Sequence, residues 1–176
     1  MQEEKVILVD SKNNQIGLMP KMEAHIKGVL HRAFSIIIFN SKSEILLQKR
    51  ASTKYHTPNL WSNTCCSHQR DGESNITAGR RRLIEEMGFV TELYEFDSFI
   101  YKVNFSSGLI EHEYDHIMLG LYDKDPLLNP LEVDDFRWIS IDDLSSDIKN
   151  NPDIYTAWFK IIIDKFSKSL KEWKLQ

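Results

Sequence analysis

One segment in the middle of the chain has both a start and a stop signal for a helix. Ser74 and Asn75 are residue types that cap helix N-termini, and Gly88 is the type that ends a helix in a left-handed turn. Small and apolar residues recur between them at helical spacing, at Ile76, Gly79, Leu83 and Met87. The sequence therefore predicts a helix from about Asn75 to Met87.

Short apolar runs typical of strands precede and follow this helix. They cover residues 6–9, 33–39, 45–47, 96–105, 113–122 and 136–139. The turn-like segment 40–43 joins the second and third of these runs into a predicted hairpin. These runs predict strands at the centre of the molecule.

Further helices are predicted near the C-terminus. Ser140, with Asp143 three residues later, is typical of the start of a short helix. Beyond it, apolar residues recur every three or four positions, at Ile154, Trp158, Ile161, Ile162, Phe166, Leu170 and Trp173. This spacing predicts a long helix with one buried face. With strands at the centre and helices outside them, we expect an α+β fold, an α/β/α sandwich.

The length and composition favour one domain. With 176 residues, of which 41% are hydrophobic, the chain is long enough for one compact core and short for two domains. We therefore expect a single domain over residues 1–176. Cys65 and Cys66 are neighbours in the sequence, so they cannot link distant parts of the fold by a disulfide.

The charge and hydropathy argue against several classes of partner. The formal net charge of −4 disfavours a general nucleic-acid or membrane-surface binder, because those partners favour a strongly basic face. No apolar run approaches the roughly 18 to 20 residues that a membrane span needs. The N-terminal segment MQEEKVILVD is acidic, unlike the basic leader of an export signal. We expect a cytoplasmic protein with no nucleic-acid and no membrane partner.

The predicted central helix ends in two adjacent carboxylates, Glu85 and Glu86, which follow Arg81 and Arg82. Carboxylates in the last turn lie at the negative end of the helix dipole, at a cost of about 0.3 to 1 kcal/mol each. A bound metal ion or a nearby arginine would remove that cost. Two hypotheses stay open: a metal-binding helix end, or an exposed helix end that the arginines neutralise.

A thiol and an imidazole lie two residues apart in segment 63–68, which is expected to be a loop after a strand at Trp61. In extended backbone, positions two apart lie on the same side, so Cys66 and His68 can face one cavity. The alternative is that Cys66 is an inert side chain that fills the core. A disulfide between Cys65 and Cys66 is disfavoured by the expected cytoplasmic location.

Glu111, His112 and Glu113 lie in a predicted strand, where alternation places both carboxylates on one face and His112 on the other. This carboxylate pair is either a solvated face or part of a metal site. The histidines that would complete such a site are His25, His31 and His68. Three imidazoles with two carboxylates suit Zn²⁺ or Mn²⁺, whereas sites with oxygen ligands alone suit Mg²⁺.

Two basic clusters occur in this acidic chain, one at Lys49, Arg50 and Lys54, the other at residues 80–82. Lysines and arginines arranged around Mg²⁺ commonly bind a diphosphate, because their N–H donors match its oxygens. Each cluster taken singly is also explained as surface charge. Trp158 either fills the core or presents an indole face that stabilises a cation by up to about 2 kcal/mol.

Taken together, these motifs resemble the type I isopentenyl-diphosphate isomerases of the Nudix superfamily. The segments that carry the resemblance, in order and approximate spacing, are 31–35, 63–68, 72–75, 81–88 and 111–115. The Cys-His segment combined with the downstream Glu-x-Glu pair is specific, whereas the Glu-Glu-x-Gly helix end marks only the superfamily. The resemblance implies a Nudix fold with a mixed central sheet flanked by helices. It also implies an isomerase that interconverts isopentenyl and dimethylallyl diphosphate.

The resemblance also implies roles for individual residues. Cys66 and Glu113 correspond to the two proton-transfer groups, with Tyr101 hydrogen-bonded beside them. The implied ligands of one tightly bound divalent ion, Mn²⁺ or Zn²⁺, are His25, His31, His68, Glu111 and Glu113. Glu86 corresponds to a contact of the Mg²⁺ that accompanies the diphosphate. The implied substrate-binding residues are Lys21, Arg50, Lys54, Arg82 and Trp158, the last of which covers the cationic centre. The expected partner is a small-molecule diphosphate, and the expected state is a monomer or weak homodimer.

The sequence departs from the related patterns at a few positions. The gap from His25 to His31 is one residue shorter than in bacterial isomerases, and Gln69 stands where a proline often occurs. A Nudix hydrolase pattern would ask for Gly at Ser67 and Glu at Arg82, so both residues disfavour a pyrophosphohydrolase acting on a nucleoside diphosphate derivative. A third hypothesis is a noncatalytic diphosphate-binding sensor with the same fold.

Overall fold

The computed structural model describes residues 4–54 and 56–173. Its strands are β1 (Lys5–Val9), β2 (Gln15–Pro20), β3 (His31–Phe39), β4 (Glu44–Arg50), β5 (Trp61–Ser62), β6 (Cys65–Ser67), β7 (Leu93–Asn104), β8 (Ile110–Leu121) and β9 (Val133–Ser140). Its helices are α1 (Lys21–Lys27), α2 (Asn75–Met87), α3 (Ile141–Asn150) and α4 (Ala157–Glu172), with a short 3₁₀ helix at Pro152–Ile154.

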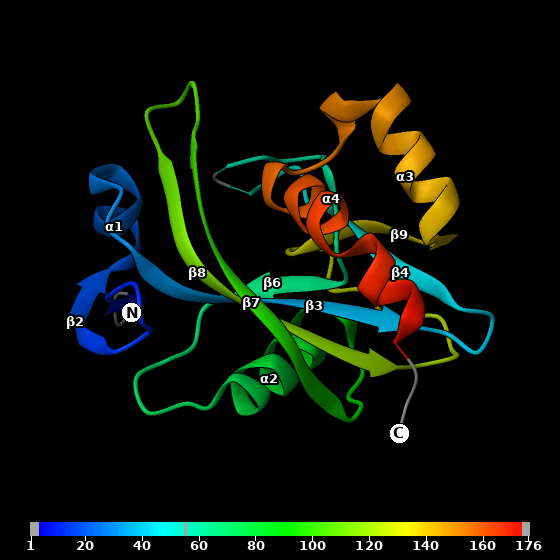
Figure 1. Cartoon of the computed structure of the whole chain (residues 1–176), viewed down its shortest axis with the longest axis horizontal. Coiled ribbons are helices and arrows are strands. Elements are labelled where there is room, and N and C mark those ends of the chain that lie inside the picture. Colours follow the sequence, from blue (N-terminus) through cyan, green and yellow to red (C-terminus); the bar gives the residue numbers. More distant parts are fainter. Residues whose placement is uncertain (1–3, 55, 174–176) are drawn as a thin grey trace.

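Strand β3 is the centre of one mixed sheet (Figure 1). It pairs in parallel with β8 and antiparallel with β1, β4 and β6. Beyond these neighbours, β7 pairs with β8, β2 pairs with β1, and both β5 and β9 pair with β4. The apolar run predicted at 33–39 is buried along its whole length, as expected for a strand that is covered on both faces.

Helices cover both faces of this sheet (Figure 1). Side chains alternate along β3, so Ile36 packs in the core that contains α2, whereas Ile37 packs in the core that contains α3 and α4. Gly79 lets α2 approach the sheet closely, because a Cβ there would lie 2.8 Å from Met118 Cε. The α+β fold with helices on both sides of a mixed sheet is confirmed.

The central helix has the bounds that its end signals predict. The Ser74 hydroxyl oxygen accepts a hydrogen bond from the backbone N–H of Thr77 at 3.2 Å, and Gly88 ends the helix with φ of 70°. The predicted short helix is α3, and Ser140 caps it through the N–H of Asp143. Local side-chain chemistry is therefore sufficient to locate both helix starts.

The closing helix begins later than expected, at Ala157 rather than near Ile154. Tyr155 forms a β-bridge with Trp61, and the N–H of Thr156 donates to the Trp61 carbonyl at 2.9 Å. These contacts hold the backbone extended up to the residue before the helix. Within the described ranges, no helix is both long and apolar enough to cross a membrane.

Three elements were not predicted: β2, α1 and β6. Helix α1 has only seven residues, directly after Pro20 and ending at Gly28, so it is too short to show a repeated apolar pattern. The segment expected to be a loop contains β6, which pairs antiparallel with β3 at Phe34–Ile36. Pairing with a distant strand, rather than local sequence, makes this segment a strand.

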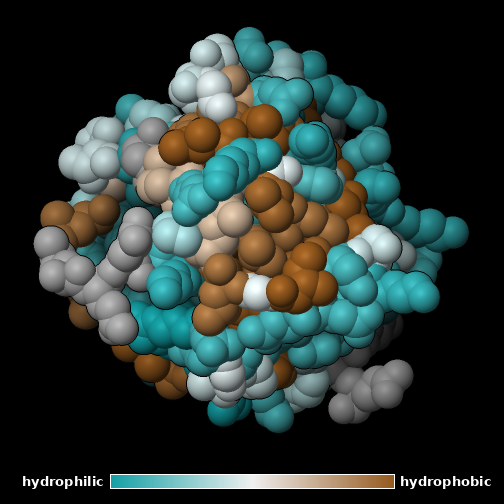
Figure 2. All heavy atoms as spheres, turned by 90° about the vertical axis from the view of Figure 1, so that its left-hand side faces the viewer, coloured by the Kyte–Doolittle hydropathy of each residue, from teal (hydrophilic) through white to brown (hydrophobic). Residues whose placement is uncertain are grey.

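Turning the molecule by 90° brings the side with β2 and α1 toward the viewer (Figure 2). Apolar side chains gather in the middle of this face, and polar side chains surround them. The exposed large apolar residues of β2 and α1 are Ile16, Leu18, Met22 and Ile26. In β2 the large apolar residues Ile16 and Leu18 are exposed, so its apolar positions do not mark a buried face of the sheet.

Candidate active site

Nearly all of the side chains singled out in the sequence line one pocket. They are Lys21, His25, Arg50, Lys54, Cys66, His68, Arg82, Tyr101, Glu111, Glu113 and Trp158. The rest of the lining is formed by Phe34, Ser35, His56 and Ser67. His31 and Glu86 do not line the pocket but contact it, His31 through Glu113 and Glu86 through Arg82.

Strand register places the central carboxylate of this pocket. Glu113 on β8 is paired with His31 on β3 at one side and with Tyr101 on β7 at the other. Paired residues of neighbouring strands point to the same face of a sheet. The Tyr101 hydroxyl donates to Glu113 Oε2 at 2.6 Å, and His31 Nε2 lies 3.4 Å from Glu113 Oε1. The sheet thus brings together three side chains that are far apart in the sequence.

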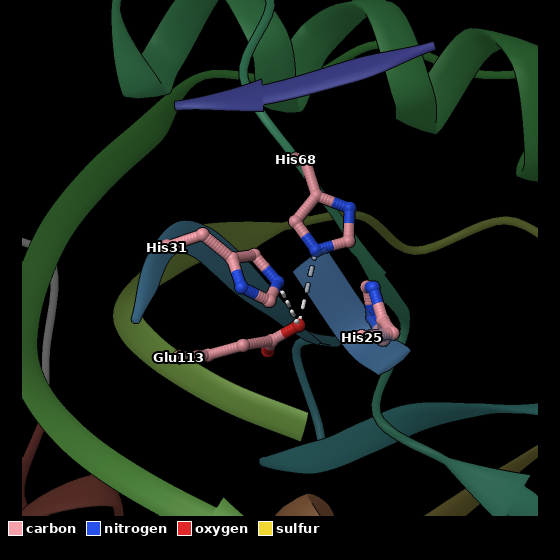
Figure 3. A group of neighbouring side chains, drawn as sticks. All are labelled: His25, His31, His68 and Glu113. Carbon is pink, nitrogen blue, oxygen red and sulfur yellow. Dashed lines mark hydrogen bonds and ion pairs between the residues drawn. The ribbon is translucent and has the colours of Figure 1, made fainter. Parts of the chain in front are cut away.

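Three histidines surround this carboxylate (Figure 3). His68 Nε2 lies 3.0 Å from Glu113 Oε1, and the ring centroids of His25 and His31 are 4.9 Å apart. One possible ligand atom from each of these four buried residues lies within 4.8 Å of the others. We call His25, His31, His68 and Glu113 the imidazole end of the pocket. Despite its short spacing to His31, His25 belongs to this group.

The backbone determines which nitrogen of two imidazoles faces the carboxylate. His25 Nδ1 lies 2.8 Å from the Lys21 carbonyl oxygen, and His31 Nδ1 lies 2.8 Å from that of Val29. Because a carbonyl oxygen only accepts, each neutral imidazole donates from Nδ1 and keeps a lone pair on Nε2. Histidines that bind metals are commonly oriented through their second nitrogen in this way.

Burial favours the neutral, metal-binding form of two of the pocket imidazoles, His25 and His68. It lowers the pKa of His68 to about 4 and also lowers the pKa of His25, so both are neutral at neutral pH. Neutral imidazole nitrogens beside a carboxylate are ligands that Zn²⁺ and Mn²⁺ accept. The residues present therefore fit a divalent transition-metal ion.

The two carboxylates of β8, Glu111 and Glu113, lie on one face, but their pKa values are shifted in opposite directions. Both accept hydrogen bonds from the Tyr101 hydroxyl, Glu113 at 2.6 Å and Glu111 at 3.2 Å. Burial and the nearby Glu113 raise the pKa of Glu111 well above its usual range. Burial also opposes ionisation of Glu113, but the hydrogen bond with His68 outweighs it and holds the pKa of Glu113 well below its usual range. These opposite shifts favour placing the negative charge of the pair on Glu113.

His112, between these carboxylates, lies on the other face of β8 as predicted. Its Nδ1 is 3.0 Å from the carbonyl oxygen of Gly28. It neither lines the pocket nor belongs to a group of possible metal ligands within the described part of the chain. Its position makes His112 a matched control for substitutions of the pocket histidines.

The two adjacent cysteines point to opposite sides of β6. Cys65 is fully buried in the core with α2, whereas Cys66 lines the pocket together with Glu113. Burial raises the pKa of Cys66 to about 12, so this thiol keeps its proton at neutral pH. The alternative of an inert core thiol applies to Cys65.

Arg82 is the centre of a second group, the arginine end, which also contains Lys54, Glu86 and Glu132. Arg82 Nη2 lies 2.5 Å from Glu86 Oε1 and 3.4 Å from Glu132 Oε1, and Lys54 also contacts Glu132. Burial alone would lower the pKa of Arg82, but Glu86 and the other acidic neighbours raise it. The helix end is neutralised by arginine, as one hypothesis expects, but Glu86 is buried rather than exposed.

Trp158 and Arg50 form a further wall of the pocket. The indole N–H of Trp158 donates to Asn63 Oδ1 at 3.2 Å, and the Arg50 guanidinium carbon lies 5.4 Å from the centre of the indole ring. Arg50 donates to the carbonyl oxygens of Thr57 and His56 at 3.1 and 3.2 Å. A guanidinium therefore lies within cation–π distance of the indole ring, which shows that this part of the pocket can hold positive charge beside a π surface.

One pocket residue with a titratable side chain, His56, was not predicted from the sequence. Its Nε2 lies 3.4 Å from Glu111 Oε1, and burial lowers the pKa of His56 to about 3. The residue lies in the connection between β4 and β5, where no periodic pattern or paired motif marks it. Its nearness to the basic cluster at Lys54 is the one signal in the sequence.

Comparison with known proteins gives one matching family model and several similar sequences. The family model of the NUDIX domain matches residues 29–159. "Isopentenyl-diphosphate Delta-isomerase 2" of Photorhabdus laumondii is 49% identical over 98% of this chain and 98% of the relative. The protein of the same name from Aromatoleum aromaticum is 49% identical over 93% of this chain and 86% of the relative.

Solved structures support the fold alone, because their sequences are distant. A Deinococcus radiodurans protein, DR0079, is 17% identical and has a TM-score of 0.75, covering 92% of this chain and 98% of that protein. The MutT protein from Methanosarcina mazei is also 17% identical, with a TM-score of 0.64, covering 80% and 94%. The isomerase relatives have a much higher sequence identity than these structures, so functional inference rests on the relatives.

Proposed function

The chain belongs to the isopentenyl-diphosphate Delta-isomerase family of Nudix proteins, and from that premise we propose that it interconverts isopentenyl diphosphate and dimethylallyl diphosphate. The observation that carries the proposal is that Cys66 and Glu113 line the same pocket while Cys65 is buried in a separate core. Moving an unactivated double bond requires one group that delivers a proton and another that removes one.

The charges of these two groups suit that exchange. The high pKa of Cys66 leaves its thiol protonated, and the low pKa of Glu113 leaves its carboxylate ready to accept a proton. In one direction the thiol protonates the terminal carbon of the double bond, which leaves the positive charge on the adjacent tertiary carbon. The carboxylate then takes a proton from the carbon on the other side of that tertiary carbon. The reverse reaction exchanges the two roles. Tyr101, which donates to Glu111 and Glu113, holds both carboxylates in place.

The state between the two transfers resembles a tertiary carbocation, which water would quench. We infer that Trp158, buried and lining the pocket, covers this centre with its indole face. Because each 1.36 kcal/mol is a factor of ten in rate, about 2 kcal/mol from the indole corresponds to roughly thirtyfold.

For the tightly bound ion we infer one divalent cation, Zn²⁺ or Mn²⁺, held by His25, His31, His68, Glu111 and Glu113. Support comes from the imidazole end, where ligand atoms converge within 4.8 Å and two Nε2 atoms keep their lone pairs. When bound, such an ion supplies a fixed positive charge beside the carboxylates. Its charge would stabilise both carboxylates in their ionised form, although they are buried.

We infer that the diphosphate, with Mg²⁺, occupies the arginine end. Arg82 and Lys54 carry the charge that phosphate oxygens require, and Arg50 and Lys21 line the same pocket. Arg82 is bound to Glu85 and Glu86, at 2.7 and 2.5 Å. A diphosphate that replaced these carboxylates as the partner of Arg82 would leave Glu86 available to Mg²⁺.

We further propose that residues 1–176 act as one domain, a cytoplasmic monomer or weak homodimer with a small-molecule diphosphate as its partner. Strands from β1 to β9 belong to one sheet, which supports a single domain.

The reaction is tested by incubating the protein with Mg²⁺ and isopentenyl diphosphate in deuterated water. We expect deuterium in a dimethylallyl product, because the delivered hydrogen comes from an exchangeable group. Cys66→Ala abolishes this product, whereas Cys65→Ala, the matched control on the same strand, keeps most of it.

Other outcomes would point to the rival functions. Release of phosphate or nucleotide from nucleoside diphosphate derivatives, without an isomerised product, would indicate a Nudix hydrolase. Tight diphosphate binding without turnover, unaffected by Cys66→Ala, would indicate a sensor. Equal loss from both cysteine variants would remove the reason for choosing Cys66.

A further inference from the structure

His56 extends the imidazole end on its far side. One possible ligand atom from each of His25, His56 and Glu111 lies within 4.8 Å of the others. His25 belongs both to this group and to the imidazole end, so the two groups are neighbours in one pocket. Glu111 joins them as well, because the Tyr101 hydroxyl hydrogen-bonds Glu111 and Glu113 together.

Packing holds the His56 ring in this position. The ring stacks on Phe105, with centroids 5.8 Å apart and planes at 22°, and lies nearly perpendicular to the Trp158 ring, with centroids 6.0 Å apart. Its Nδ1 lies 3.0 Å from the Thr57 hydroxyl oxygen, while Nε2 faces Glu111 at 3.4 Å. The side chain is 8% exposed. An imidazole held on both sides by aromatic rings loses little further freedom when it binds a ligand.

The backbone next to His56 has an uncommon conformation. Thr57 has φ of +46°, in the left-handed region that a β-branched residue rarely adopts. Such a conformation is unfavourable for threonine and persists only where surrounding contacts enforce it. Here the Thr57 carbonyl accepts from Arg50 and its hydroxyl contacts His56. The conformation therefore orients two pocket side chains at once.

We propose that His56 Nε2 is a further ligand of the divalent ion at the imidazole end. This inference rests on the proposed metal centre. His25 offers only Nε2, because its Nδ1 is held by the Lys21 carbonyl, so it cannot bind two ions at once. The two groups therefore describe one ion with an additional ligand rather than two ions. A centre with His56 contains four imidazoles, which favours a borderline ion such as Zn²⁺ or Co²⁺ over Mg²⁺.

The first test measures metal affinity rather than turnover. His56→Phe keeps an aromatic ring between Phe105 and Trp158 but removes the ligand nitrogen, and His112→Phe is the matched control on the other face of β8. In chelator competition with Zn²⁺, we expect His56→Phe to bind at least about tenfold more weakly, the lower end of the loss seen when groups around a metal are removed. The control should bind like the parent, and the visible spectrum of bound Co²⁺ should change in His56→Phe alone.

A second test needs no variant. With nitrogen-15 in the imidazoles, Zn²⁺ titration of the parent protein should shift a ring nitrogen in four of its six histidines, those at 25, 31, 56 and 68. A shift in only 25, 31 and 68, or an unchanged affinity in His56→Phe, would overturn the proposal while leaving the metal centre intact. If His31→Ala also left the affinity unchanged, the proposed metal centre itself would be wrong.

Discussion

The imidazole end and the arginine end of the pocket differ in what balances their charges. At the imidazole end, the Glu113 carboxylate is contacted by the imidazoles of His31 and His68, and burial keeps His68 neutral. At the arginine end, Arg82 and Lys54 are cations that already contact Glu86 and Glu132. One end has an ionised carboxylate beside uncharged ligands, whereas the other has paired opposite charges.

Because of this difference, we expect the two ends of the pocket to bind their ligands in different ways. Among the described residues, no ion pair between full charges has to break when a cation enters the imidazole end. We therefore expect the ligand side chains to be in place before the ion binds. A diphosphate at the arginine end must take the place of carboxylates, because buried ionised groups need a partner at every stage. The first end is therefore expected to determine affinity for the metal, and the second to determine how tightly the substrate binds.

The largest effect is expected for metal binding at the imidazole end. His31→Ala or His68→Ala removes a direct ligand, and we expect the affinity for Zn²⁺ to fall by at least about a hundredfold, the upper end of the losses seen for indirect supports. Arg82→Ala and His112→Ala should keep the metal. Elemental analysis of the purified variants measures this. Loss of metal in Arg82→Ala would break the separation between the two ends.

Substitution of Trp158 tests whether the part of the pocket where the reaction occurs is separate from the imidazole end and the arginine end. We expect Trp158→Ala to reduce kcat about thirtyfold, because the indole face stabilises the cationic state by about 2 kcal/mol. Its KM and metal content should change little. The measurement is steady-state kinetics with isopentenyl diphosphate at saturating Mg²⁺. A rise in KM alone would instead assign Trp158 to diphosphate binding through its neighbour Arg50.

The parts of this molecule that local chemistry determines were predictable. The helix at 75–87 has caps at both ends within its own sequence, so its bounds were predicted correctly. Alternation along β8 was enough to separate His112 from Glu111 and Glu113. In each case the deciding interactions lie within a few residues of one another.

The parts that long-range pairing determines were not predictable from pattern alone. Cys65 and Cys66 are equivalent in the sequence, and only the pairing of β6 with β3 sends one to the core and the other to the pocket. The convergence of His31, Glu113 and Tyr101 depends on the register of three strands. The family resemblance supplied these assignments in advance. His56 was missed because it lies outside the motifs that carry the resemblance.

A smaller effect is expected at the arginine end. Arg82 contacts Glu86 through two nitrogens and Glu85 through a third, a fork that the single ammonium of lysine cannot reproduce. We expect Arg82→Lys to raise KM about tenfold, because it loses one charge-assisted hydrogen bond of about 1.5 kcal/mol. The bound metal should be retained.

Glu132→Gln also tests whether the diphosphate replaces carboxylates as the partner of Arg82 and Lys54, but the expected change in KM has the opposite sign. Glu132 contacts both Arg82 and Lys54, so removing its charge weakens the internal pairs that a diphosphate must replace. We expect KM to fall in this variant, in contrast to its rise in Arg82→Lys. A KM that rises in both variants would show that the carboxylates orient the cations for substrate rather than compete with it.

The smallest effect is expected for the pH dependence of metal affinity. Ligand imidazoles must be neutral, so a site of ordinary histidines loses up to about tenfold in affinity per histidine for each pH unit below about 6.5. Here burial lowers the pKa of His68 to about 4 and lowers that of His25, so between pH 7 and 5.5 His68 has almost no proton to displace and His25 has less of one than an ordinary histidine. Chelator competition with Zn²⁺ should show a loss of affinity over this window that is shallower than the slope for ordinary histidines. A steep loss already at pH 6 would mean that the imidazole end is not neutral before the ion binds, and the contrast with the arginine end would disappear.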